Sequence, residues 1–316
     1  MREKWIGNTP LVRLDSCEEN EVYMKLEGSN LYGSAKDRAA FYVLSQLMRE
    51  GMIDKDTEIV ESSSGNMGVA LAAVGAQMGL KVTIVIDPSI SELNEFLIHS
   101  YHANTIKIME ADANGSYLKR RLEMVQAYIK SKAKVYWFNQ YGNEKVAQAY
   151  RETLGKEIID AVPDVEYIFM AVSSGGTVAG VSEAAKRYST SAKVIAVDIE
   201  GSKIFDPDSK VVKHLTGIGS SICSDNLKRA YIEDKVIVTE REALKGLRDL
   251  LDKEQLFLGA SSGCVYAGAT RYLTERQIKG KKCVMISHDR GERYFRNLYE
   301  RYFSEYLPDI RLGGEK

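Results

Sequence analysis

One lysine and three later loops of the chain combine residue types that could do chemistry together. Lys36 lies in the small-residue run Gly33–Arg38, and the loops are Ser62–Asn66, Ser173–Thr177 and Gly259–Gly263. A lysine amine can hold an aldehyde as a Schiff base and then act as a base, while serine hydroxyls and backbone N–H groups bind anions. The four segments together match the needs of a lysine-bound pyridoxal phosphate (PLP). Without the three loops, Lys36 would be interpreted as an ordinary solvated surface lysine.

The loop Ser62–Asn66 lies between an expected strand and an expected helix. Its hydroxyls and amides therefore gather at a helix N-terminus, which attracts anions. We expect Ser63, Ser64 and Gly65 to bind the α-carboxylate of an amino acid, and Asn66 to bind the phenolic oxygen of the cofactor. Taken alone, the same residues would form an ordinary helix N-cap.

The two later loops are predicted to hold the phosphate and the ring of the cofactor. In a glycine-containing turn, successive backbone N–H groups can form a nest that binds a phosphate monoester. The chain has neither a Walker lysine nor a G-x-G-x-x-G fingerprint, which would indicate a nucleotide instead. The Ser261 hydroxyl is expected at the pyridine nitrogen, where it favours loss of a β-substituent through an α-aminoacrylate. The expected phosphate-binding residues are Ser173, Ser174, Gly175, Gly176 and Thr177.

Strand-like and helix-like patterns alternate along the chain, which predicts an α/β fold with a largely parallel sheet. The expected strands are residues 58–61, 81–86, 105–109, 135–139, 167–172, 193–199 and 282–287. The expected helices are residues 39–51, 65–79, 117–132, 144–162, 177–188, 240–254 and 263–279. The turn-rich segment 201–221 is the longest irregular stretch, so we expect it to cover a site.

Composition narrows the class of protein. The chain has 316 residues and a formal net charge of -1, so no basic surface for nucleic acid or for an anionic membrane is predicted. No signal-peptide-like run and no stretch long enough to cross a bilayer is present, so we expect a cytoplasmic protein acting on small molecules. The cysteines lack metal-ligand spacing, and no metal site is expected; they are Cys17, Cys223, Cys264 and Cys283.

Motifs along nearly the whole chain resemble fold-type II PLP enzymes, specifically the cysteine synthase (O-acetylserine sulfhydrylase) and cystathionine β-synthase family. The similar segments are Ile6–Leu14, Ser34–Arg38 and Gly291–Tyr294. The resemblance implies that Lys36 carries PLP and that Gln140 binds the substrate carboxylate. It also implies that a loop closes over the substrate, at Gly217, Ile218 and Gly219.

The same resemblance implies the architecture. It predicts two three-layer α/β/α domains with mostly parallel sheets, of the tryptophan synthase β-like type, and a homodimer. We expect residues 37–141 to form the smaller domain with the substrate-carboxylate loop. Residues 1–36 and 142–316 are expected to form the larger domain, which binds the PLP phosphate and ring.

Some positions depart from cysteine synthases and resemble a narrower branch. Met67 follows Asn66 at the expected substrate site, and Tyr150 stands where the family often has histidine. The branch is the siderophore-pathway synthases that join O-phosphoserine and glutamate into N-(2-amino-2-carboxyethyl)-glutamate. The segments shared with it are 87–91, 112–115, 140–141 and 289–291, and the residues implied at its phosphoserine end are Arg121, Tyr141 and Ser173.

The leading hypothesis is PLP-dependent β-replacement on cysteine or an O-activated serine. Open alternatives are the phosphoserine–glutamate synthase, a cysteine hydroxy-lyase that releases hydrogen sulfide and forms serine, a serine/threonine dehydratase, and a non-catalytic PLP-binding protein. A water-adding enzyme needs a carboxylate near Cβ. Candidates by loop placement are Asp225, Asp289 and Asp87, although capping or ion pairing would equally explain such aspartates.

Overall fold

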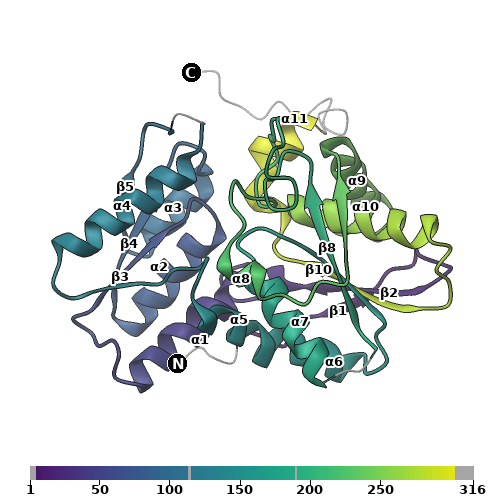
Figure 1. Ribbon diagram of the computed structural model, residues 1–316, viewed down its shortest axis with the longest axis horizontal. Coiled ribbons are helices and arrows are strands. Elements are labelled where there is room, and N and C mark those ends of the chain that lie inside the picture. The colour runs from purple at the N-terminus through teal and green to yellow at the C-terminus, as the bar shows by residue number, and fades with distance from the viewer. Residues whose placement is uncertain (1–4, 113–114, 189–190, 303–316) are drawn as a thin grey trace.

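The computed structural model describes residues 5–112, 115–188 and 191–302. Its strands are β1 (Leu11–Arg13), β2 (Glu21–Leu26), β3 (Glu58–Ser62), β4 (Lys81–Ile86), β5 (Asn104–Lys107), β6 (Val135–Trp137), β7 (Tyr167–Ala171), β8 (Lys193–Ile199), β9 (Asp234–Val238) and β10 (Lys282–Ser287). They form a six-stranded sheet in the order β1-β2-β10-β7-β8-β9 and a four-stranded sheet in the order β5-β4-β3-β6. The two sheets lie in the right and left parts of Figure 1.

The helices lie against both sheets (Figure 1). They are α1 (Lys36–Arg49), α2 (Asn66–Met78), α3 (Glu92–Ser100), α4 (Tyr117–Ser131), α5 (Glu144–Tyr150), α6 (Lys156–Ala161), α7 (Gly176–Tyr188), α8 (Asp225–Lys228), α9 (Glu240–Glu254), α10 (Ala260–Glu275) and α11 (Glu300–Tyr302). Only the β1–β2 pair is antiparallel among the described strand pairs. The predicted α/β fold with mostly parallel sheets is confirmed.

Strand β10 lies inside the six-stranded sheet and pairs in parallel with both β2 and β7. Lys282 is in register with Glu21, and Cys283 is in register with Tyr167. This pairing places a strand from near the C-terminus between one from the N-terminal segment and one from the middle of the chain.

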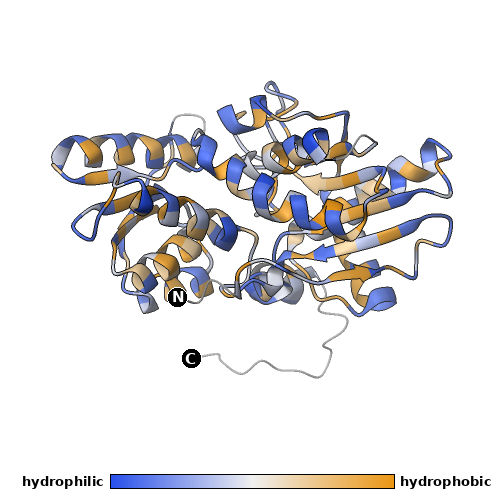
Figure 2. Cartoon of the chain, turned by 90° about the horizontal axis from the view of Figure 1, so that it is seen from below, coloured by the Kyte–Doolittle hydropathy of each residue, from blue (hydrophilic) through white to orange (hydrophobic). Residues whose placement is uncertain are grey.

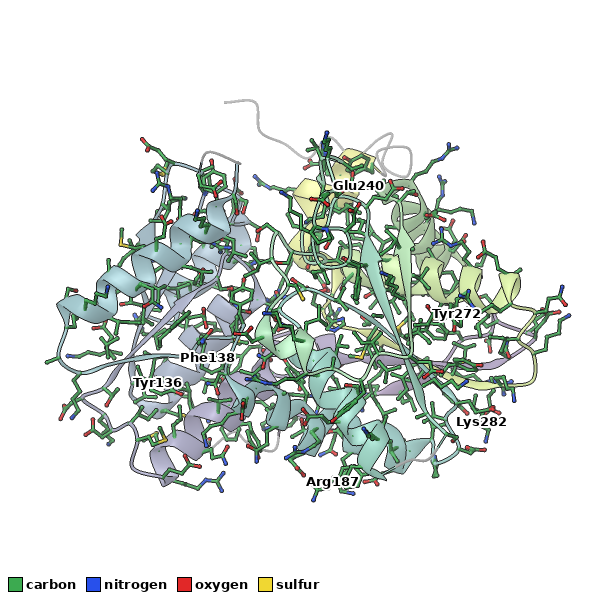
Figure 3. All side chains as sticks on the ribbon, in the orientation of Figure 1. Tyr136, Phe138, Arg187, Glu240, Tyr272 and Lys282 are labelled. Carbon is green, nitrogen blue, oxygen red and sulfur yellow. The ribbon has the colours of Figure 1, made fainter. Side chains whose placement is uncertain are left out.

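Helices with one hydrophobic side turn that side toward the sheets, as the orange and blue sides of the helices in Figure 2 show. Helix α2 is an exception, because its small and aliphatic residues are buried over most of its length. A Cβ on Gly75 of α2 would lie 2.2 Å from Val82 Cγ2, so only glycine allows α2 to pack this closely on β4. Phe138, labelled in the smaller part of the molecule in Figure 3, is also fully buried.

A buried ion-pair network ties the N-terminal segment to α1 and α6. The Arg38 side chain is fully buried and lies 2.6 Å from Glu27 (Nε to Oε2) and 2.6 Å from Glu157 (Nη1 to Oε1). Lys25 Nζ adds a contact of 2.8 Å to Glu157 Oε2. Burial opposes ionisation of both glutamates, but Arg38 outweighs it, so the pKa of Glu27 is lowered and that of Glu157 falls to about 2.

Some elements differ from the sequence-based predictions. Strands β1, β2 and β9 and helices α3, α8 and α11 were not predicted, and α10 begins at Ala260 instead of residue 263. The predicted helix over residues 144–162 is divided into α5 and α6 by a π-helical turn at Arg151–Gly155. Helix α1 begins at Lys36, not near Ala39, because side chains stabilise the turn before it. Asp37 Oδ2 accepts the Tyr32 N–H at 2.6 Å, and Ser34 Oγ accepts the Lys36 N–H at 3.2 Å.

The division into domains at residues 37–141 remains a prediction. Strands β3, β4, β5 and β6 of the four-stranded sheet all come from inside that range. None of the helices within residues 5–112, 115–188 and 191–302 has both the length and the hydrophobicity that crossing a membrane requires.

Candidate active site

A cavity of about 340 Å³ opens where loops of the four-stranded sheet meet loops of the six-stranded sheet. It lies beyond the carboxyl ends of the parallel strands β3, β7 and β10, the usual place for a ligand site in such sheets. Its lining includes Lys36 and residues from the segments 63–67, 171–178, 213–221 and 288–294.

Lys36 is the first residue of α1 and exposes part of its side chain to this cavity. Within the described part of the chain its Nζ makes no hydrogen bond and no ion pair. Enclosure by protein lowers the pKa of the amine to about 8, although the nearby Asp289 carboxylate favours the charged form. At pH 7 about one tenth of the Lys36 amine is therefore neutral, far more than for an ordinary lysine, which suits a nucleophile or a base.

Tyr150 and His288 position the backbone before Lys36. The Tyr150 hydroxyl donates to the Ala35 carbonyl oxygen at 3.0 Å, and the Ala35 N–H donates to the His288 carbonyl oxygen at 2.8 Å. The Tyr150 ring also lies under the lysine, with its centroid 6.0 Å from Nζ. Burial, with Lys36 beside it, lowers the pKa of His288 to about 4, so this imidazole is neutral at neutral pH.

The loop after β7 has the backbone geometry that suits an anion. Helix α7 begins at Gly176, so its first backbone N–H groups lack acceptors within the helix. Gly175 has φ +81°, and a Cβ there would lie 2.6 Å from the Leu227 backbone nitrogen, so the turn requires glycine. The Ser224 hydroxyl fixes the loop by donating to the Ser174 carbonyl oxygen at 2.8 Å.

The Asn66 side chain lies between residues of the 288–294 segment. Its Nδ2 donates to Asp289 Oδ2 at 2.5 Å, and its Oδ1 accepts a hydrogen bond from Arg293 Nη1. Tyr294 donates its hydroxyl proton to the same Asp289 oxygen at 2.6 Å. Asp289 is fully buried, which raises its pKa above the usual aspartate value.

At another part of the cavity, Arg121 of α4 contacts both Asp87 and Ser64. Its Nε lies 3.0 Å from Asp87 Oδ2, and its Nη1 donates to Ser64 Oγ at 3.0 Å. Tyr141 lies nearby, and burial raises the pKa of its hydroxyl to about 12 even though Arg121 opposes the shift. This end of the cavity therefore combines a cation with neutral hydroxyl groups.

Gln140 is fixed by the loop after β3. Its Nε2 donates to the Ser62 carbonyl oxygen at 3.0 Å, and its backbone N–H donates to Glu61 Oε2 at 2.8 Å. Glu61 also accepts the Ser62 N–H at 2.6 Å. Burial raises the pKa of Glu61 to about 7, so its environment holds a proton more readily than an ordinary glutamate does.

The segment around Gly217 forms one wall of the cavity. Gly217 has φ +87°, and a Cβ there would lie 2.6 Å from Tyr294 Oη. The Gly219 N–H donates to the Val172 carbonyl oxygen at 2.8 Å, and the Gly219 carbonyl oxygen accepts the Ser173 hydroxyl at 3.1 Å. These bonds connect the segment around Gly217 to the loop after β7.

Residues 3–289 match the family model described as pyridoxal-phosphate-dependent enzyme. The chain belongs to this family. It is therefore a PLP-dependent enzyme, and PLP is its cofactor.

Solved structures of several PLP enzymes are similar to this one. A hydrogen sulfide-producing enzyme from Fusobacterium nucleatum has 30% sequence identity and a TM-score of 0.85, with 92% of this chain and 98% of that chain covered. Cysteine synthase from Entamoeba histolytica has 28% identity and a TM-score of 0.86, with 99% and 91% covered. O-acetylserine-dependent cystathionine beta-synthase from Helicobacter pylori has 25% identity and a TM-score of 0.86, with 94% and 97% covered.

The residues of the cavity fit PLP. The Lys36 amine has no acceptor among the described residues and is available to an aldehyde. The first turn of α7 and the Gly175 nest offer N–H donors to a phosphate. Asp289 Oδ1 and His288 Nδ1 are buried without a hydrogen-bond partner in the described part of the protein, so polar groups remain unsatisfied around this site.

Most of the residues predicted from the sequence line this one cavity. They are Lys36, Ser63, Ser64, Gly65, Asn66, Met67, Arg121, Gln140, Tyr141, Ser173, Ser174, Gly175, Thr177, Gly217 and Asp289. Gly176, the first residue of α7, does not line the cavity. Ser261 is buried in the first turn of α10 and does not line it either. The role of Ser261 at the ring nitrogen remains a prediction.

The three aspartates proposed as water activators are placed differently. Asp289 lines the cavity, whereas Asp87 lies behind it in the ion pair with Arg121. The Asp225 side chain is 65% exposed, pairs with Lys228 on α8 and does not line the cavity, because it occupies the exposed first turn of that helix. Only Asp289 has a position from which it could contact a ligand directly.

Several lining residues were not predicted as site residues, namely Ser89, Ser91, Asn94, Lys213, His288, Arg293 and Tyr294. Arg293 and Tyr294 lie in the closing motif Gly291–Tyr294, which could have signalled them. Lys213 lies in the segment 201–221 that was expected to cover a site, whereas nothing in the local pattern distinguishes Asn94 from an ordinary surface residue.

Proposed function

We propose that this protein catalyses β-replacement on an amino acid. The α-proton and a substituent on Cβ are lost, and a nucleophile then adds to Cβ. Bound PLP supplies the electron sink that makes the Cα–H bond acidic. The Lys36 amine carries the proposal, because it lines the cavity at the start of α1 and its lowered pKa, about 8, suits it to accept the α-proton. The name of the similar cysteine synthase supports this type of reaction.

The remaining residues would bind and orient the substrate. Ser63 and the N–H groups at the start of α2 would bind the α-carboxylate, together with the second Nε2 proton of Gln140. The amide of Asn66 would donate to the phenolic oxygen of PLP. The segment around Gly217 would exclude water from the reacting atoms.

We propose that the leaving group is an anion and that the donor is O-phosphoserine. Arg121 supports this choice because its guanidinium is largely buried, lines the cavity and is accompanied by the Tyr141 hydroxyl. Guanidinium groups bind phosphate through charge-assisted hydrogen bonds. The nucleophile would be the amino group of glutamate, which gives N-(2-amino-2-carboxyethyl)-glutamate and inorganic phosphate.

A second candidate is a cysteine hydroxy-lyase, which converts cysteine and water into serine and hydrogen sulfide. The Fusobacterium nucleatum enzyme, whose name states that it produces hydrogen sulfide, supports this candidate. Asp289 is a carboxyl group within the cavity that could take a proton from water.

The purified, PLP-loaded protein should be incubated in parallel with O-phosphoserine, O-acetylserine and L-cysteine, each with and without glutamate. Mass spectrometry of the products, with assays of phosphate and sulfide, identifies the reaction. The proposal requires phosphate release that depends on glutamate, and Lys36→Ala must abolish it. Sulfide and serine from cysteine alone would favour the hydroxy-lyase instead. A further incubation with L-serine tests the dehydratase, which would release pyruvate.

We also propose a homodimer located in the cytoplasm, supported by the sequence resemblance. Light scattering after gel filtration would test the dimer, since a mass near 35.3 kDa would correspond to a single chain. Cell fractionation would test the location.

A further inference from the structure

The side-chain amide of Asn66 lies between two groups with opposite hydrogen-bonding character. Asp289 Oδ2 accepts from Nδ2 at 2.5 Å, and Arg293 Nη1 donates to Oδ1. An ionised carboxylate only accepts hydrogen bonds, and a guanidinium only donates them. The reverse orientation of the amide would place N–H groups against the guanidinium and a carbonyl oxygen against the carboxylate. Only one of the two orientations satisfies both neighbours.

Both neighbours are themselves held in place. Asp289 is 1% exposed, its Oδ2 also accepts the Tyr294 hydroxyl at 2.6 Å, and its carbonyl oxygen accepts the Gly259 N–H at 3.1 Å. Arg293 donates from Nη2 to the Tyr32 carbonyl oxygen. Neither side chain can follow a rotation of the amide without breaking these bonds.

We propose that Asp289 and Arg293 are positioning residues that fix the amide orientation of Asn66, so that it offers an N–H and never its carbonyl oxygen to PLP. Nδ2 carries two protons, and Asp289 takes one of them, so one N–H remains for the phenolic oxygen. This inference deepens the proposed function and rests on the assignment of Asn66 made there.

The choice of orientation matters because the two ends of an amide have opposite effects on an oxygen that carries negative charge. An N–H stabilises such an oxygen, whereas a carbonyl oxygen repels it. A hydrogen bond to a charged group is worth enough to change a dissociation constant by roughly ten-fold or more.

The test uses the variants Asp289→Asn and Arg293→Gln, prepared as full-length apoproteins. Asp289→Asn keeps the shape and replaces an acceptor by an amide that can also donate, whereas Arg293→Gln gives a shorter side chain and removes the donor to Asn66 Oδ1. PLP is then titrated, with protein fluorescence giving its dissociation constant and absorbance giving the position of the band of bound cofactor. We expect about ten-fold weaker PLP binding in each variant and a displaced absorbance band, because part of the Asn66 population turns its carbonyl oxygen to the cofactor.

A second pair of variants tests whether the effect passes through Asn66. In the Asn66→Ala background, Arg293→Gln should change neither the band position nor the dissociation constant further. Asp289→Asn also acts on the charge of Lys36, so it is compared in that background at pH 10, where the Lys36 amine is neutral with or without Asp289, and it should then have no further effect. Asp164→Asn, an exposed carboxyl paired with Lys282, is the matched control and should leave both unchanged.

Unchanged band positions in both variants of the wild-type background would overturn the inference, as would effects that persist fully without Asn66. If Asn66→Ala itself leaves the band in place, the assignment of Asn66 in the proposed function is wrong, which is a different result from failure of the positioning residues alone. Arg293 is only partly buried, so Arg293→Gln provides the answer even where Asp289→Asn does not fold.

Discussion

Arg121 of α4 is paired with Asp87, with its Nε 3.0 Å from Asp87 Oδ2. Asp87 is buried and Arg121 nearly so, and both lie in the part of the molecule built on the four-stranded sheet. The carboxylate offsets part of the guanidinium charge, while Nη1 still donates to Ser64 at the cavity wall. A cation held in this way is oriented before a ligand arrives, which reduces the entropy lost on binding.

The first prediction concerns donor choice. Arg121→Ala should lower kcat/KM for O-phosphoserine by about 100-fold, because a charge-assisted hydrogen bond to the phosphate is lost. It should change kcat/KM for O-acetylserine only slightly, since acetate is released from a less charged donor. Arg120→Ala is the matched control, because the neighbouring Arg120 is exposed and pairs with Glu123. Equal losses for both donors would show that Arg121 acts through folding and not through the leaving group.

The second prediction concerns pH. Lys36 attacks an aldehyde only as the neutral amine, and burial lowers its pKa to about 8. The rate at which apoprotein takes up PLP covalently, measured by stopped-flow absorbance, should therefore rise with pH and level off above about pH 8. Asp289 favours the charged amine, so Asp289→Asn should move the rise to lower pH. A rate that keeps climbing toward pH 10.5, the ordinary lysine value, would contradict the assignment.

The third prediction concerns Gly217. Gly217→Ala combines an unfavourable positive φ with a Cβ 2.6 Å from Tyr294 Oη. Gly51→Ala is the matched control, because Gly51 also has positive φ, at +68°, but no atom within 4 Å of the added Cβ. Both should lose about 1–2 kcal/mol of stability from the backbone. Only Gly217→Ala should also lower turnover, and steady-state kinetics beside thermal unfolding would separate the two effects.

The fourth prediction concerns the buried network around Arg38. Glu27→Gln should destabilise the protein by about 3–5 kcal/mol, because it removes the fully buried one of the two carboxylates that contact the buried guanidinium. Urea unfolding would measure this, and Asp160→Asn in the exposed Lys156–Asp160 pair should have little effect. An unfolding free energy unchanged by Glu27→Gln would show that Glu157 alone compensates the charge.

The same network predicts acid sensitivity. The pKa of Glu157 is lowered from 4.5 to about 2, so its ionised form contributes stability that is fully present above pH 4.5. This contribution is lost as pH falls toward 2. Urea unfolding repeated between pH 6 and pH 2 should show a smaller decrease in Glu157→Gln than in the native protein.

Much of the candidate site could be predicted because its parts are local in the sequence. The residues next to Lys36, and the position of Ser173–Thr177 between a strand and a helix, are enough to suggest their roles. Lys36 and all of Ser173–Thr177 except Gly176 line the cavity. The strand and helix periods also predict the α/β fold.

The rest depended on contacts that no local pattern encodes. Asn66 and Asp289 are 223 positions apart, so their hydrogen bond could not be inferred without the fold. Asp225 was predicted as a candidate site residue from its loop position alone. The tertiary structure shows instead that its side chain is exposed and pairs with Lys228. Strand β2 was missed because Val22 and Met24 alternate over only six residues in a polar segment.

The central position of β10 has a consequence for biosynthesis. Strands β3 to β6 come from one continuous stretch and can pair as soon as it leaves the ribosome, whereas β2 and β7 must wait for β10, which is made only after residues 172–281. Until then both strands present an unpaired edge, which can pair wrongly with another chain. Asp289 follows directly after β10, so the cavity lining is completed only once β10 has been made, and a chain cut before Lys282 lacks the lining residues Asp289, Arg293 and Tyr294.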